Sequence, residues 1–211
     1  MASAGNDLHV LAEDGMVMLS VIQPRDLKAE ILQTPLRVGT PIPGTVAMRI
    51  QCSQENLKRH SSYFCELLQT QEVGTASAAD QIEITECDPE TFLLAMKIVH
   101  GKPHDDSSLE LGQLALLAFI VDRYKLHDIM RDFTDSQFNL VESQLFTTGQ
   151  INNEDLERWL FICWVFSKRQ RLNAAVRMAI KTAGYSLSFV TAPNPVHLVG
   201  KNIDLLPQEN C

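Results

Sequence analysis

The sequence is poor in positive charge and in long apolar runs. It has 18 Lys and Arg residues against 26 Asp and Glu residues, which gives a net charge of −8 at pH 7 and an isoelectric point near 5.2. A nucleic-acid surface or an anionic membrane surface needs clustered cations, so this balance argues against both as partners. The apolar run from Trp159 to Phe166 is far shorter than the roughly 20 residues needed to span a bilayer.

Paired cysteine spacings and a leader segment are also missing. Residues 1–7 have neither a basic start nor an apolar stretch, so no secretory signal is expected. An odd number of cysteines without paired spacing predicts reduced thiols in the cytoplasm or nucleus rather than a disulfide framework. The five cysteines are Cys52, Cys65, Cys87, Cys163 and Cys211.

Motifs of catalysis are absent as well. The sequence has no nucleophile elbow, no dinucleotide-binding glycine motif and no phosphate-binding loop. His100 and His104 have the spacing of helical zinc ligands, but a glycine and a proline lie between them and no further ligands complete a site. Cys52 with His60 lacks the electropositive setting of a catalytic thiol. We therefore predict no catalytic residue, no cofactor and no metal, and we predict structural thiols.

The first two-thirds of the chain alternates segments typical of strands and of helices. Residues 23–44 hold four prolines and two glycines, so this segment is predicted to be a long loop inserted between two strands. Serine or aspartate residues precede several apolar stripes and are expected to cap helices there. The predicted elements are strands at 16–22 and 45–51, helices at 53–57 and 63–69, a strand at 81–85, and helices at 89–99, 107–124 and 126–133.

Two of these helices have well-defined end signals. Asp88 is expected at an N-cap, with Pro89 in the first turn and Gly101 just beyond the last turn. Ser107-Ser108-Leu109-Glu110 fits a capping box at the start of the next helix.

The C-terminal part is predicted to be helical. Residues 134–151 are polar and weakly patterned, which favours a domain boundary in this segment. One helix is predicted over 154–182, and its apolar run 159–166 is interpreted either as fully buried or as a docking surface. The basic cluster Lys168-Arg169-Gln170-Arg171 is interpreted as a solvated helix face rather than an import signal.

Three motifs carry a family resemblance. Met48 to Leu57 followed by His60 to Phe64 resembles the pattern V-x-S-x-x-L … S-x-x-F. Asp88 to Phe92 with Ile98-Val99-His100-Gly101 resembles D-P-E-A-F … I-I-H-G, and the segment Leu114 to Tyr124 ends in a match to V-D-K-Y. With the order of predicted elements over residues 8–133, these motifs resemble the BTB/POZ domain, in the form abundant in filamentous fungi.

The resemblance implies an α+β fold in which a small β-sheet is capped by helices. Residues 8–138 correspond to the BTB/POZ-like domain, with the long Pro-rich insertion at 23–44, and residues 139–211 form a helical extension and tail. Trp159 and Trp164 resemble the Trp-rich helix that follows the family's core in fungal proteins. The implied activity is protein–protein association, often as a homodimer, and recruitment of partners to a cullin-type ubiquitin ligase, without catalytic residues.

These considerations predict a set of partner-binding side chains. Cullin-binding relatives carry a hydrophobic-x-Glu motif after the second core helix, and Thr70-Gln71-Glu72 retains its acid without the apolar residue. The predicted contact residues are Tyr63, Leu67, Leu68, Glu72, Trp159 and Trp164.

Two other functions stay open at this point. One is a nuclear regulatory scaffold without ligase contact. The other is an enzyme of unrecognised type, which requires convergence in a pocket of two or more of His60, His100, His127 and Asp122.

Overall fold

The computed structural model describes residues 7–13, 15, 17–23, 45–72, 80–85, 87–104, 108–147 and 151–182. The predicted insertion therefore lies outside the described residues from position 24 to 44. Cys211 and the predicted tail after residue 182 lie outside them as well.

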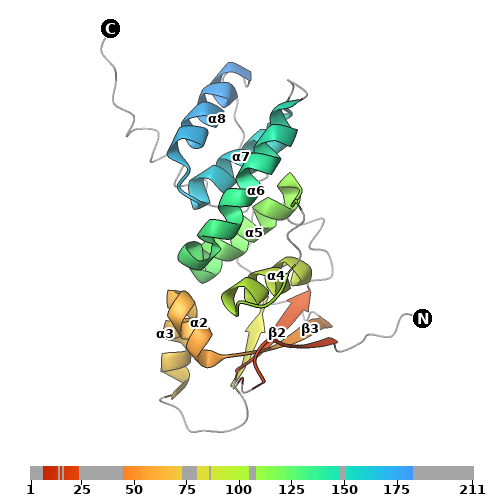
Figure 1. The fold of residues 1–211 in the computed structure, drawn as a ribbon, viewed down its shortest axis with the longest axis vertical. Helices are drawn as coiled ribbons and strands as arrows, with labels where there is room; N and C mark the ends of the chain where they lie inside the picture. Colours follow the sequence, from red (N-terminus) through yellow and green to blue (C-terminus); the bar gives the residue numbers. More distant parts are fainter. Residues whose placement is uncertain are drawn as a thin grey trace, which may run out of the picture.

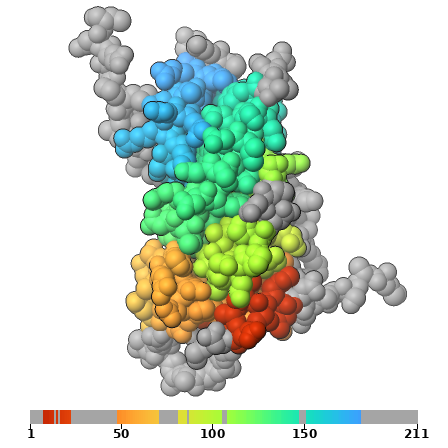
Figure 2. Space-filling view, viewed as in Figure 1, coloured from red at the N-terminus to blue at the C-terminus, as the bar shows by residue number. Residues whose placement is uncertain are grey.

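A four-stranded mixed sheet occupies one end of the molecule, beside α2 and α3 (Figures 1 and 2). The strand order is β1-β3-β2-β4; β2 runs antiparallel to β3, while β1 is parallel to β3 and β4 is parallel to β2. The strands are β1 (Asp7–Val10), β2 (Val17–Gln23), β3 (Thr45–Cys52) and β4 (Asp80–Ile84). The sequence missed β1, because four residues are too few to show a period-two pattern.

The two faces of the sheet differ in burial. Side chains alternate along each strand, so every second residue points towards the helices. The buried face is lined by Val17, Leu19, Val21, Met48, Ile50, Cys52, Ile82 and Ile84. The opposite face carries Gln81 and Glu83, which are exposed, and Arg49 and Gln51, which are half-buried.

Helices cover the buried face and continue away from it into a second layer (Figure 1). α4 packs on β2 and β3, α5 packs on α4, and α6 and α7 pack on α5. α8 packs on α7 at the far end of the molecule. The helices are α2 (Gln54–His60), α3 (Ser62–Glu72), α4 (Pro89–Val99), α5 (Leu111–Tyr124), α6 (His127–Thr147), α7 (Asn153–Val165) and α8 (Arg169–Thr182).

The predicted ends of α4 are confirmed. The Asp88 side chain accepts a hydrogen bond from the Thr91 N–H at 3.0 Å, and Pro89 occupies the first turn. Gly101 has a φ of 59°, and the Lys102 N–H donates to the Lys97 carbonyl at 2.8 Å, which closes a Schellman motif.

The start of α5 differs from the prediction. The helix begins at Leu111, and the capping box is formed by Glu110 and Gln113 instead of a serine and Glu110. The Gln113 Oε1 accepts a hydrogen bond from the Glu110 N–H at 3.0 Å. Ser107 lies outside the described residues. An acid therefore takes the N-cap position that the sequence pattern assigned to serine.

α6 is longer than predicted and includes much of the segment assigned to a boundary. Its buried stripe contains Thr134 (1% exposed) and Gln137 (2%) beside Phe138 (0%) and Val141 (1%). Thr134 donates a hydrogen bond to the Met130 carbonyl, and the Gln137 Oε1 accepts one from the Leu109 N–H at 2.8 Å. Two polar residues with satisfied hydrogen bonds thus hid the helical pattern. The helix runs across residue 138, at which the sequence divided the predicted domains.

The single helix predicted over 154–182 is wrong, because the chain turns between α7 and α8. Ser167 has a φ of 54°, and the Lys168 N–H donates to the Cys163 carbonyl at 2.8 Å in a Schellman motif. Serine gives no sequence signal for this left-handed conformation. The apolar run in α7 is buried, with Trp159 at 1% and Ile162 at 0% exposure, which confirms the first of its two interpretations.

Two residues of the basic cluster are ion-paired rather than solvated. Lys168 pairs with Asp135, and the Arg171 Nε lies 2.9 Å from the Glu142 Oε2. Both cations lie 5.4 Å from the centroid of the Phe138 ring. Residues three apart share one side of a helix, so this pair joins the start of α8 to α6.

We predict that Ser167→Gly raises the free energy of unfolding by about 0.5–1 kcal/mol, because glycine adopts positive φ without a Cβ clash. Urea denaturation measures the change. Ser136→Gly is the control: Ser136 is exposed inside α6, and its replacement should lower stability by about 0.5–1 kcal/mol. A loss of stability in Ser167→Gly would indicate a continuous helix at this position.

Candidate protein-interaction site

The N-terminus of α3 is fixed by one buried serine. The Ser61 Oγ accepts a hydrogen bond from the Phe64 N–H at 3.0 Å and donates one to the Tyr124 carbonyl at 2.6 Å. Ser61 is only 2% exposed. The same hydroxyl therefore caps α3, as predicted for Ser61 or Ser62, and ties it to the end of α5.

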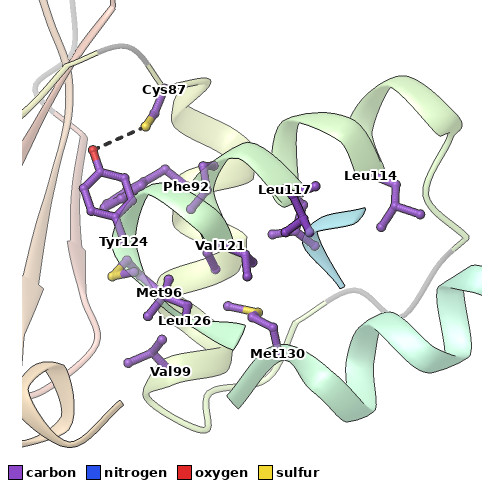
Figure 3. Packing of buried hydrophobic residues seen from close by; sticks show 14 of the residues in the cluster. Cys87, Phe92, Met96, Val99, Leu114, Leu117, Val121, Tyr124, Leu126 and Met130 are labelled. Carbon is purple, nitrogen blue, oxygen red and sulfur yellow. Dashed lines mark hydrogen bonds between the residues drawn. The ribbon is translucent and has the colours of Figure 1, made fainter. Parts of the chain in front are cut away.

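An aromatic cluster around Tyr124 fixes the orientation of α3. The Tyr124 ring stacks on Phe64 at a centroid distance of 5.4 Å and meets the edges of Tyr63 and Phe92 at 5.2 and 5.4 Å. Its hydroxyl lies 3.5 Å from the Cys87 Sγ (Figure 3). Burial raises the pKa of Tyr124, which keeps the phenol neutral. The cluster joins α3, α4 and α5.

Two of the predicted contact residues on α3 lie beside its exposed surface. Tyr63 and Leu67 are one turn apart and partly buried, and both pack against the core. The exposed Glu66 and Thr70 border them. Because Tyr63 is held by the Tyr124 cluster, this apolar strip, Tyr63 and Leu67, has a fixed position.

The other predicted contact residues are placed differently. Leu68 is 0% exposed and Trp159 is 1% exposed, so both side chains belong to the core of this chain. Trp164 is partly buried and stacks on Phe161 at 6.5 Å. Glu72 ends α3, and its side chain lies outside the described residues. Because α3 and α7 are at opposite ends of the molecule (Figure 1), the structure does not bring the two groups together.

His100 has a structural role that the sequence only partly predicted. Its Nε2 accepts a hydrogen bond from the Ser53 N–H at 3.0 Å, and its Nδ1 lies 2.9 Å from the Met96 carbonyl, to which it donates in the neutral tautomer. The residue was expected at a helix end, but its bond to Ser53 joins α4 to the start of α2. Burial lowers the pKa of His100, which favours this neutral form.

The titratable groups named for an enzyme occupy separate places. His127 and Asp122 lie 3.9 Å apart at the α5–α6 turn, with side chains 40% and 35% exposed. Both ring nitrogens of His100 already contact the backbone. Among the described residues, no three His, Cys, Asp or Glu side chains are grouped as metal ligands.

The buried cysteines have the properties of structural thiols. Burial raises the pKa of Cys52 to about 12 and that of Cys163 to about 12. A thiol with such a pKa is protonated at neutral pH and is a poor nucleophile. In the described ranges, no helix has both the length and the apolarity to cross a membrane.

We predict that His100→Ala lowers the free energy of unfolding by about 1–3 kcal/mol, because the Ser53 N–H loses its acceptor. The lowered pKa of folded His100 means that the unfolded chain binds more protons below pH 6.5. The contribution of His100 is therefore present above this pH and lost as the pH falls towards the folded pKa.

Urea denaturation between pH 7.5 and 5 tests this prediction. His100→Ala should flatten the fall in stability, and His127, whose pKa is also lowered by burial, should supply the remaining slope. His104→Ala is the control histidine removal. A wild-type slope that His100→Ala leaves unchanged would contradict the role of His100.

Comparison with known proteins adds no relative to this geometry. No protein-family model matches the chain, and no curated protein matches its sequence. The functional interpretation therefore rests on the site itself and on the motifs in the sequence.

Proposed function

We propose that this chain is a non-catalytic protein–protein interaction module, with the apolar strip on α3 as its contact surface. The observation that carries the proposal is the placement of Tyr63 and Leu67 beside exposed polar residues on a helix that Ser61 and Tyr124 hold in place. Protein interfaces combine an apolar centre with a polar rim, and a fixed surface loses little entropy on binding.

The arrangement of elements supports a BTB/POZ-like fold for this module. The order β2-β3-α2-α3-β4-α4-α5 follows the element order on which the resemblance was based. Its motif residues also have structural roles: Asp88 caps α4, His100 joins α4 to α2, and Tyr124 centres the aromatic cluster. These roles explain why a fold of this kind uses such residues at these spacings.

Within such a fold, the proposed partner of α3 is a cullin-type scaffold. The module then acts as an adaptor that recruits other proteins to a ubiquitin ligase, in the cytoplasm or the nucleus. Glu72, at the end of α3, is proposed as the acidic residue of this contact. A regulatory scaffold in the nucleus that uses the same strip for another protein is the alternative.

We predict that Leu67→Asp weakens binding to a purified cullin-type scaffold at least about tenfold, or about 1.4 kcal/mol, because a carboxylate would replace an apolar contact. Biolayer interferometry measures the affinity. Gln69→Asp is the control, since Gln69 is exposed on the opposite flank of the same helix and adds the same charge.

Thermal melting separates binding from folding, because Leu67 also packs against the core. Leu67→Ala, which adds no charge, should fold and should still bind less tightly than Gln69→Asp. Equal affinities for the wild type, Leu67→Asp and Gln69→Asp would contradict the α3 contact. A wild type that binds no cullin-type scaffold and concentrates in the nucleus would favour the regulatory alternative.

A further inference from the structure

β1 presents an unpaired edge at one end of the sheet. Its neighbour is β3, and no other described strand pairs with it. The Leu11 N–H donates to the Gln51 carbonyl at 2.9 Å, so the backbone groups of Leu11 and His9 face β3. Because the direction alternates along a strand, the N–H and carbonyl groups of Leu8 and Val10 point to the open side.

The side chains on this edge are apolar and accessible. Leu8 is 53% exposed and Val10 is 49% exposed, and they are two of the four large hydrophobic side chains exposed among the described residues. They share the outer face of the sheet. Protected edge strands commonly carry proline, lysine or a bulge, and the sequence Asp7-Leu8-His9-Val10 has none of these.

We propose that β1 pairs antiparallel with β1 of a second copy of this chain. The edge is self-complementary around His9: a two-fold axis at His9 places Leu8 opposite Val10 of the second copy, and the reverse. The outward backbone groups then face outward groups. Each of these two residue pairs exchanges both N–H and carbonyl groups, so the pairing forms four hydrogen bonds.

The residues beside this edge suit such an interface. The register places Arg49 beside Leu8 and Gln51 beside Val10. The two apolar pairs at the centre are therefore bordered on each side by a long polar side chain, as in other protein interfaces. The Gln51 Nε2 donates to the carbonyls of Glu13 and Gly15 at 3.3 and 3.2 Å, so this part of the border is already ordered.

A second copy explains the edge better than a foreign strand does. A foreign strand requires only free backbone groups and apolar neighbours. Pairing with a second copy also requires two apolar residues symmetric about a central residue, with the correct backbone direction, and β1 meets this condition.

The strand pair is short and each copy carries a net charge of −8, so the dimer is weak, with a dissociation constant on the order of 0.1 mM. Added salt screens the repulsion and strengthens it.

This inference deepens the proposed function by naming a second copy as a partner, and it uses a surface separate from α3. Sedimentation equilibrium of the full chain over a range of concentrations, at low and high salt, tests it. The wild type should show a monomer–dimer equilibrium that shifts to dimer with salt. Val10→Pro should raise the dissociation constant at least tenfold, because proline lacks only the outward N–H and leaves the bonds to β3 intact.

Two further variants keep the test independent of folding. Val10→Lys places a charge opposite Leu8 of the second copy and should weaken the dimer while the melting temperature stays unchanged. Ile180→Lys is the matched control, since Ile180 on α8 is 66% exposed, and it should dimerise like the wild type. A monomeric wild type, or wild-type dimerisation of both Val10 variants, would overturn the proposal, and so would loss of the dimer in Ile180→Lys.

The scaffold measurement separates this proposal from the function. Val10→Pro should still bind the cullin-type scaffold, which supports two separate surfaces. Dimerisation that depends on Val10 in a protein that binds no scaffold contradicts the proposed function and supports the pairing of β1.

Discussion

The packing of Tyr124 is the interaction on which the first half of the molecule depends. Its ring contacts α3 through Phe64 and α4 through Phe92, and its carbonyl accepts the Ser61 hydrogen bond. Tyr124 is 3% exposed, so these contacts are shielded from water. Because one residue joins three helices, α3 cannot shift relative to the sheet without breaking several contacts at once. The fixed position of the apolar strip is a consequence of this packing.

A second cluster has the corresponding role in the C-terminal half. The Phe138 ring contacts Trp159 at 5.4 Å and Phe166 at 5.7 Å, while Lys168 and Arg171 approach the same ring. Phe138 thus joins α6 to α7 and to the start of α8. α5 contacts both α4 and α7, so it links the two clusters. The helical extension is therefore packed on the first half rather than attached by a free linker.

Local signals were sufficient for some of these features and insufficient for others. The ends of α4 were predictable because Asp88, Pro89 and Gly101 act within one turn of the helix. Ser167 takes a glycine-like conformation that tertiary packing imposes, and the acid paired with Lys168 is distant in sequence. For the candidate site, helical spacing identified Tyr63, Leu67 and Leu68 as one group. It did not separate the buried Leu68 from its two partly exposed neighbours, because that distinction depends on how α5 packs against α3.

The position of α8 gives the molecule an uneven distribution of charge. Residues 168–182 contain five Lys and Arg residues and no acid, so a total of −8 leaves −13 for the rest of the chain. This segment lies at the end of the molecule opposite the sheet. Separated charge of this kind produces an electric dipole, which orients a protein as it approaches a charged body. An acidic surface would thus meet this molecule α8 first, with the sheet and α3 directed away.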